Sequence, residues 1–321
     1  MYIRVLILIT MIAIATLPIV AAEEKPVVVC TTSVLASIVK DLAGDKVVVE
    51  VIASPSVCPA HYDIKPSDVE KVRMASLILY HGFEPWIKDL VKASGSKAPL
   101  VAIKGPWNTP NLLKKKYEEV AKALEKYLGI DVSEKLRRCL KAIDETSQWL
   151  KKFAEEYGFT NTPVIVMLWQ KNFVSFLGFK IVGVFGPPEK VSLKQFEELV
   201  KNGTKYGAVL VIDNLQSGVE LGKKLAKEIG AIEVALTNFP YTAPELVNMT
   251  EVMKYNARLL AQALQYARWR SSSAEVGQLY EEINSLRAEL SLWRYAFIAS
   301  ALINVALLVC VVVLVAKLRR R

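Results

Sequence analysis

The first hundred residues of the chain alternate short apolar runs with amphipathic segments. Each run has five or six residues rich in Val, Ile and Leu, as buried strands have. These predicted strands cover residues 26–30, 47–52, 75–80 and 99–103. The predicted helices between them cover residues 34–43, a segment from Ser67, and residues 86–92. Strands that alternate with helices predict a mostly parallel sheet covered by helices.

The same alternation returns in the second half of the chain. Its predicted strands cover residues 164–168, 179–185, 208–212 and 232–236. Its predicted helices cover residues 192–201, 218–229 and 250–269. A second lobe with its own mostly parallel sheet is therefore expected.

One long helix is predicted between the two series. Residues 131–157 contain no Gly or Pro, and their apolar residues recur at heptad-like spacing. At about 1.5 Å per residue the helix would be roughly 40 Å long, enough to run behind two lobes. Asp131 and Glu134 have the spacing of a capping box, as do Ser67 and Glu70. The predicted fold class is α/β, with two lobes joined by one backbone helix.

A longer apolar run lies near the beginning of the sequence. Residues 5–22 follow Arg4 and end in small residues before Glu23. This pattern predicts a cleaved secretory signal over residues 1–22, with an uncleaved anchor as the alternative.

A second long apolar run, residues 295–316, can cross a bilayer. Trp293 and Tyr295 mark its outer edge, and the basic residues 317–321 follow it. Because such charges stay in the cytoplasm, we expect a single-pass cell-membrane protein with an extracellular ectodomain and a cytoplasmic C-terminus. Together the two runs account for a mean hydropathy of +0.28.

The predicted domain organisation follows from these elements. It is a signal peptide (1–22), an N-terminal α/β lobe (23–130), a linking helix (131–158), a C-terminal α/β lobe (159–269), a coiled-coil-like stalk (270–292), a transmembrane helix (293–316) and a basic tail (317–321).

Apolar residues of the stalk recur at alternating steps of three and four. They are Val276, Leu279, Ile283, Leu286, Leu290 and Trp293. This heptad seam predicts a parallel homodimer, in which Glu282 would face Arg287 of the second copy. Glu289 would face Arg294, and Asn304 of the span continues the seam. The alternative is a plain helical stalk whose apolar stripe packs on the lobes or on a permease.

Charge and motifs exclude two classes of function. The net charge is +9, but part of it lies in the tail and the rest alternates with Glu on helices, so no nucleic-acid partner is expected. The motifs of serine hydrolases, zinc proteases, phosphate loops and dinucleotide-binding folds are missing from the sequence. Cys58 and His61 need not meet as a nucleophile pair, so the protein is not expected to be an enzyme.

The two histidines of the chain both follow predicted strands. His61 lies in a turn-rich loop with Cys58 and Asp63, and His81 lies close to Glu84. Ligands of parallel α/β sheets bind beyond the carboxyl ends of strands, so both histidines are expected to face one cleft. The alternative is that each is a hydrogen-bonded loop residue.

The four cysteines form no CxxC pair. Cys30 ends one predicted strand and Cys58 follows its neighbour, so a disulfide between them is possible in an oxidising compartment. The alternative is two unrelated thiols.

The stretch around His61 resembles a known family, the ABC-importer substrate receptors that carry zinc or manganese. The family loop reads Asp-Pro-His-Asp-Tyr-Glu-Pro and then Ser-Asp, and the chain has Cys58-Pro59-Ala60-His61-Tyr62-Asp63-Ile64-Lys65-Pro66-Ser67-Asp68. The setting of Asn256 is similar to the start of the family's last long helix. The resemblance covers roughly residues 27–264 and implies a two-lobed solute-binding protein.

The resembled receptors offer four metal ligands, and this chain matches only the first, His61. Trp107 stands where a second-ligand His is expected, and Gln170 stands at the third position. Thr237 or Asn238 takes the place of the fourth, a carboxylate. Neutral amides are poor zinc ligands.

Two interpretations of the cleft remain. In the first, zinc or manganese is bound by a relocated set of ligands, of which the candidates are His61, His81, Asp63 and Asp213, with Cys58 as a further one. In the second, the cleft binds an organic or chelated solute. The residues expected to line it are Cys58, Tyr62, Glu84, Trp107, Gln170 and Asn238.

The resemblance implies a membrane-tethered extracellular receptor of an ABC importer, with a permease and an ATPase as partners and zinc, manganese or a metal chelate as its transported ligand. No cysteine follows the predicted signal to carry a lipid. The C-terminal span is therefore the expected tether, an arrangement expected at an archaeal cell surface. The alternative is a receptor for a non-metal solute, or an adhesion module that has lost metal binding.

Overall fold

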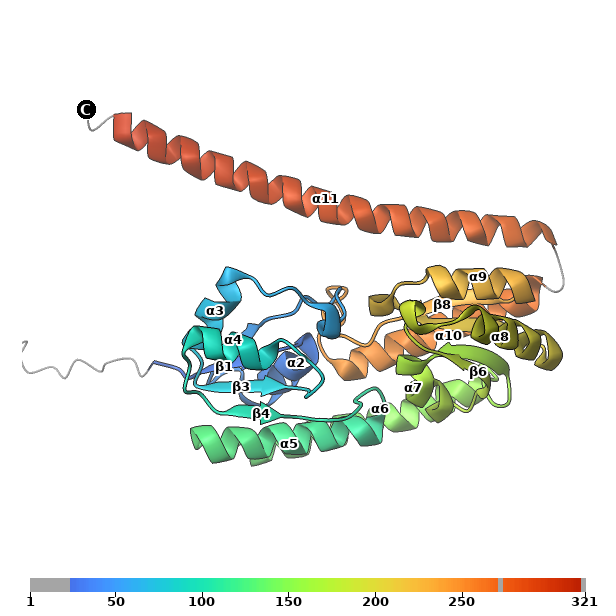
Figure 1. The fold of residues 1–321 in the computed structure, drawn as a ribbon, viewed down its shortest axis with the longest axis horizontal. Helices are drawn as coiled ribbons and strands as arrows, with labels where there is room; N and C mark the ends of the chain where they lie inside the picture. The colour runs from blue at the N-terminus through green and yellow to red at the C-terminus, as the bar shows by residue number, and fades with distance from the viewer. Residues whose placement is uncertain (1–23, 271–273, 319–321) are drawn as a thin grey trace, which may run out of the picture. The chain divides into compact units, whose positions relative to one another are not determined.

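The computed structural model describes residues 24–270 and 274–318. The predicted signal lies outside these residues. The α/β part of the chain divides into two compact units, each with helices on both faces of a sheet (Figure 1).

The chain passes from one unit to the other three times. The first unit runs to Ser147 and also contains Phe239–Val252, and the second contains Gln148–Asn238 and continues from Met253. Residues 239–252 fall inside the predicted lobe 159–269, yet they pack with the first unit.

The first unit is built on a parallel sheet with the strand order β2-β1-β3-β4. Its strands are β1 (Val27–Cys30), β2 (Val48–Val51), β3 (Leu77–Tyr80) and β4 (Leu100–Ala102). Its helices are α2 (Ser33–Ala43), α3 (Pro66–Arg73), α4 (Ile87–Ser94) and α5 (Pro110–Leu128). On one face Val29 and Ile78 pack with Val72 of α3 and Leu90 of α4. The four predicted strands are confirmed.

The second unit repeats this plan with the order β6-β5-β7-β8, again all parallel. Its strands are β5 (Pro163–Met167), β6 (Lys180–Phe185), β7 (Leu210–Asn214) and β8 (Ile232–Leu236). Its helices are α7 (Lys171–Phe176), α8 (Leu193–Tyr206), α9 (Glu220–Ile229) and most of α10 (Met249–Arg270). Ile165 and Val211 pack with Leu199 of α8 and Leu225 of α9. The parallel sheet predicted for the second lobe is confirmed.

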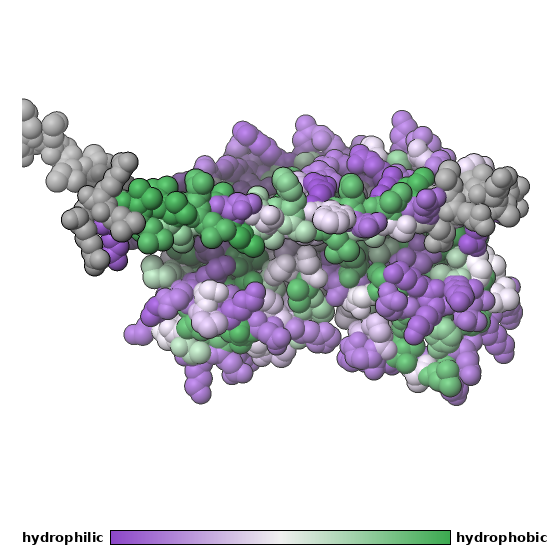
Figure 2. All heavy atoms as spheres, turned by 90° about the horizontal axis from the view of Figure 1, so that it is seen from above, coloured by the Kyte–Doolittle hydropathy of each residue, from purple (hydrophilic) through white to green (hydrophobic). Residues whose placement is uncertain are grey.

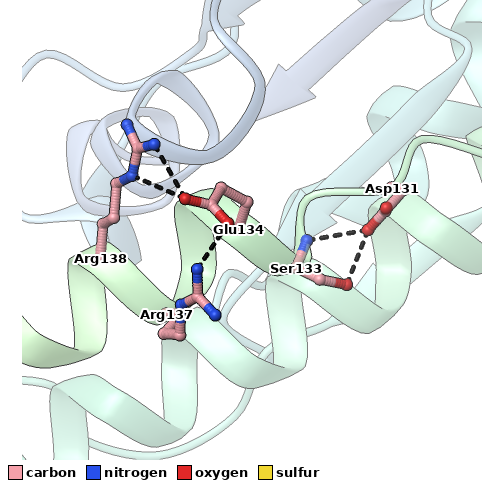
Figure 3. A network of polar contacts seen from close by, with 5 residues as sticks. All are labelled: Asp131, Ser133, Glu134, Arg137 and Arg138. Atoms are coloured by element: carbon pink, nitrogen blue, oxygen red, sulfur yellow. Dashed lines mark hydrogen bonds and ion pairs between the residues drawn. The ribbon is translucent and has the colours of Figure 1, made fainter.

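The predicted long helix is α6, Ser133–Glu156, which starts in the first unit and ends in the second. Asp131 stabilises its start, since its carboxylate accepts hydrogen bonds from the backbone N–H and the hydroxyl of Ser133 (Figure 3). Glu134 does not complete the predicted capping box, because its carboxylate faces Arg137 and Arg138. These ion pairs are exposed, so they add little stability.

The second predicted capping box also differs. Asp68, and not Glu70, reaches back to the start of α3, where its carboxylate accepts a hydrogen bond from Lys65 N at 2.8 Å. Glu70 instead pairs with Arg73. Both corrections have one cause: an exposed Glu finds an Arg on the next turn of its helix.

The C-terminal apolar run forms one helix, α11 (Ala274–Leu318). Within it, Glu282–Lys317 is long and apolar enough to cross a membrane, and none of the window is buried. Figure 2 shows apolar side chains gathered toward the C-terminal end of α11 and mixed polar and apolar side chains nearer its start.

The predicted disulfide is not formed. Cys30 is buried at the end of β1, Cys58 is half-buried, and both are free thiols. Burial raises the pKa of the Cys30 thiol far above its usual range, so this cysteine behaves as a small apolar core residue.

Candidate functional site

Polar side chains of the first unit gather where β1 and β3 end. Thr31 and Thr32 follow β1, and His81 and Glu84 follow β3; all four are buried. Because β2 and β3 lie on opposite sides of β1, the end of β1 is the topological switch point of the sheet. Ligand sites of parallel α/β sheets lie at such points.

Glu84 is saturated by donors from its own neighbourhood. Its carboxylate accepts hydrogen bonds from the Thr31 hydroxyl at 2.5 Å and from the backbone N–H groups of His81, Gly82 and Phe83 at 2.9 to 3.1 Å. The side chain is 4% exposed. Glu84 therefore braces the turn after β3, and little of its carboxylate remains for a ligand.

Both nitrogens of His81 have partners. Nδ1 lies 3.3 Å from the carbonyl oxygen of Ile103, which can only accept, so Nδ1 carries the proton. Nε2 then accepts from the Thr32 hydroxyl at 2.9 Å. The Trp107 ring stacks on the imidazole, with 4.2 Å between ring centroids. His81 is thus a covered, hydrogen-bonded residue and not an exposed ligand.

Burial keeps His81 neutral. It lowers the pKa of the imidazole to about 4, and the positive charge of Lys116 acts in the same direction. The charge of Glu84 and the hydrogen bond to Ile103 oppose this shift without reversing it. A neutral, fully bonded imidazole stabilises the fold at neutral pH.

His61 is presented differently, on an exposed and well-supported loop. It ends the 3₁₀ turn η1 (Pro59–His61) and is exposed. The turn is stabilised by the Trp86 indole, which donates a hydrogen bond to the Pro59 carbonyl oxygen at 2.7 Å. Beyond the histidine, the Tyr62 hydroxyl donates to the buried Asp68 carboxylate at 2.9 Å. The loop therefore offers the His61 imidazole to solvent.

Of the predicted metal ligands, His61, His81 and Asp63 belong to the first unit and Asp213 belongs to the second. In residues 24–270 and 274–318, no three His, Cys, Asp or Glu side chains gather closely enough to hold a metal ion. The predicted set was His61, His81, Asp63 and Asp213. Asp63 is exposed and lies close to His61 in the sequence, whereas His81 is buried directly after β3.

Amide side chains occupy the corresponding edge of the second unit. Gln170 follows β5, Asn214 ends β7 and Asn238 follows β8. The Asn214 carbonyl oxygen accepts from Gln170 Nε2 and from Asn238 Nδ2, each at 3.0 Å. Gln170 is 0% exposed, and its Oε1 accepts no hydrogen bond from the part of the chain that the structure describes.

A second set of bonds extends this amide network. The Gln216 amide donates to the Thr237 hydroxyl at 2.9 Å, and Asn256 of α10 bonds both the N–H and the carbonyl of Thr237. Gln170, expected at the third ligand position, and Thr237 and Asn238, the two candidates for the fourth, are thus held by neutral neighbours. This network can bind polar groups but offers no charge to a bare cation.

Asp213 lies beneath α9 and not at the sheet edge. It is 1% exposed, and its carboxyl group packs so closely on Gly222 that a Cβ there would lie 1.7 Å from its Oδ2. Burial and the adjacent carboxyl of Glu233 raise the pKa of Asp213 to about 8. The alternation of β7 explains the placement, because Val211 and Asp213 share one face and that face packs on α8 and α9.

The sequence analysis missed Thr31 and Thr32. The signal was present, since both follow a predicted strand as His81 does. Threonines were not expected at the site because neither is a usual metal ligand. Their role is to orient Glu84 and His81 through hydrogen bonds.

Two α/β units with parallel sheets, a connecting helix and polar clusters at the strand ends define a solute-binding protein. A family described as zinc-uptake complex component A, periplasmic (ZnuA), matches residues 28–263. The chain belongs to this family, which consists of solute-binding proteins and not of enzymes.

Individual relatives agree with this assignment. The iron-binding protein YfeA of Yersinia pestis is 26% identical, with 60% of this chain and 79% of YfeA covered. The manganese ABC transporter substrate-binding lipoprotein PsaA of Streptococcus pneumoniae is 37% identical over 22% of this chain and 25% of its own length. In four curated relatives, PsaA among them, the match spans 25% to 31% of the relative's length.

Solved structures share the fold. A ZnuA crystal structure has a TM-score of 0.63 and 18% identity, and it covers 75% of this chain and 100% of its own. The Mn-bound periplasmic metal binding protein from Candidatus Liberibacter asiaticus has a TM-score of 0.66 and 15% identity, with the same coverage. At these identities the similarity supports the fold alone.

Proposed function

We propose that the chain is the membrane-tethered substrate receptor of an ABC importer, and that it captures zinc or manganese as a complex with a small organic chelator. The observation that carries the proposal is the contrast between His61, exposed on a supported loop, and the neutral amides Gln170 and Asn238, which are hydrogen-bonded to Asn214. One imidazole cannot satisfy a cation that prefers four or more ligands. The remaining donor atoms would come from the chelator.

The rest of the molecule is compatible with this ligand. Neutral amides suit the polar groups of an organic solute better than a bare ion. The relatives named above are described as binding iron or manganese, which supports a metal as part of the cargo. A non-metal solute is the second candidate, favoured by the buried, unbonded Oε1 of Gln170.

Thermal unfolding of the full-length chain in detergent tests the proposal. The probes are Zn²⁺ and Mn²⁺ alone and each with excess citrate or L-histidine. A chelated metal at about 100 times its dissociation constant should stabilise the protein by about 2.7 kcal/mol. His61→Ala should abolish this shift, and Ser67→Ala, which changes an exposed residue of the same stretch, should keep it.

Three results would contradict the proposal. An equal shift in the wild type and in His61→Ala would remove His61 from the site. A rise in unfolding temperature with Zn²⁺ or Mn²⁺ in the absence of a chelator would mean that the receptor binds the free ion. No rise with any form of either metal would favour the non-metal solute.

A further inference from the structure

α11 is an unbroken helix of 45 residues that runs from the stalk into the membrane-compatible segment. At about 1.5 Å per residue it is roughly 70 Å long, twice the thickness of a bilayer's hydrocarbon core. Because no break interrupts it, apolar positions in the stalk and in the span share one helical register. On a straight helix a seam of this period drifts by about 20° per heptad, and a left-handed supercoil of two helices keeps it at one interface from the stalk into the span.

Large apolar side chains are uncovered along the described part of the stalk. They are Ile283 (40% exposed), Leu286 (55%), Leu290 (64%) and Trp293 (67%). They follow the alternating steps of three and four that define a heptad core. Val276 and Leu279 extend the pattern in the sequence, but their side chains lie outside the described residues.

The charges beside this seam specify how a second helix would lie. Glu282 and Glu289 precede core positions, and Arg287 and Arg294 follow them. None of these four side chains has an ion-pair partner among the residues that the structure describes. In a parallel pair each Glu faces an Arg of the second copy five positions later, whereas an antiparallel pair brings like charges together.

The heptad pattern of the seam continues into the apolar segment. At the next core positions stand Phe297, Ser300, Asn304 and Leu307. Ser300 is small enough for close approach of two helices, and Asn304 is the one strongly polar residue of residues 295–316. An amide in hydrocarbon is stabilised by a bond to another helix. In a parallel dimer, Asn304 of one copy would face Asn304 of the other.

We infer that the chain forms a parallel homodimer through α11, with the stalk seam and Asn304 at its interface. The second copy of this chain is the partner because the charge pattern is complementary to itself. The inference goes beyond the proposed function and does not depend on any ligand.

Cysteine crosslinking in membranes tests the dimer. The full-length chain carries Cys58→Ser, Cys139→Ser and Cys310→Ser, and either Leu286→Cys on the seam or Ala288→Cys on the opposite face. We expect a disulfide-linked dimer under oxidising conditions for Leu286→Cys and at least fivefold less for Ala288→Cys. Equal yields, or no dimer from an accessible thiol at position 286, would overturn the inference in favour of a stalk that packs on another protein.

Two further variants test the parallel order and the role of Asn304. Glu289→Arg should weaken the dimer, and adding Arg294→Glu to the same chain should restore it, since the pair is then reversed. Asn304→Leu should raise the dimer dissociation constant about three- to thirtyfold, the range of interhelical bonds in lipid. No rescue by the double charge variant would exclude the parallel arrangement.

Discussion

His81 and His61 follow neighbouring elements of one unit, yet their surroundings give them opposite roles. His81 is covered by Trp107 and bonded at both nitrogens, so it serves the fold. His61 is exposed on a turn that Trp86 supports, so it is available to a ligand. The placement of a histidine after a strand was predictable, but its burial depended on a tryptophan 26 positions away.

The lowered pKa of His81 predicts a pH dependence of stability. Its folded-state value of about 4 lies below the unfolded value of 6.5, so between these values the unfolded chain binds more protons. Stability should therefore fall as the pH drops from 6.5 to 4, by up to about 1.4 kcal/mol per pH unit from this group. Asp213, whose pKa is raised, contributes with the opposite sign.

Urea unfolding at several pH values isolates this effect. Between pH 4.5 and 6.5, the unfolding free energy of His81→Gln should rise less with increasing pH than that of the wild type, because the contribution of His81 is removed. Ser67→Ala changes an exposed side chain that does not titrate in this range and should keep the wild-type slope. Identical slopes in all three proteins would contradict the neutral, buried imidazole.

The candidate site was only partly predictable from residue types. His61 lies in the turn-rich loop after β2 as predicted, because this loop is local in sequence and is supported by Tyr62 and Trp86. Asp213 was expected at the sheet edge but lies beneath α9. Strand alternation decides which face a side chain takes, and the exact end of β7 could not be predicted from its apolar run.

At the scale of elements, all eight strands were predicted within about two residues because buried parallel strands are continuous apolar runs. Helix α5 was missed. Its signals were local and present: Thr109 and Pro110 at its start and Gly129, with φ of 66°, at its end. The long helix between the units was predicted because its apolar spacing is uninterrupted by Gly or Pro.

Helix α6 carries a prediction of its own, because it belongs to both units. Gln148 is exposed near its middle, at the division between the units. Gln148→Pro should destabilise the protein by about 3 kcal/mol or more, since it removes a helix hydrogen bond and clashes with the preceding turn. It should also separate the thermal unfolding of the two units into two transitions.

Calorimetry of Gln148→Pro and Gln148→Ala measures both effects. The alanine variant removes the same exposed side chain but keeps the backbone bond, so it should unfold in one transition close to that of the wild type. A single, unshifted transition in the proline variant would show that α6 does not couple the units.

At the scale of the whole molecule, the apolar part of α11 predicts where the protein is found. The full-length chain should stay in the membrane fraction after alkaline carbonate washing, and a chain that ends at Arg270 should be recovered in the soluble fraction. The reason is that the described segment long and apolar enough to cross a bilayer, Glu282–Lys317, lies beyond that residue. Membrane retention of the shortened chain would mean that another segment anchors it.

In the membrane-tethered receptor proposed above, the length of α11 would also affect how the protein meets its partners. About 20 of its 45 residues suffice to cross a bilayer, so roughly 25 remain outside it, about 38 Å at helical rise. With such a tether the two α/β units stay within a layer a few nanometres deep. Encounter with an importer in the same membrane then depends on the number of molecules per unit area and not on the bulk concentration. A solute needs to diffuse only to this layer, after which its delivery is a search in two dimensions.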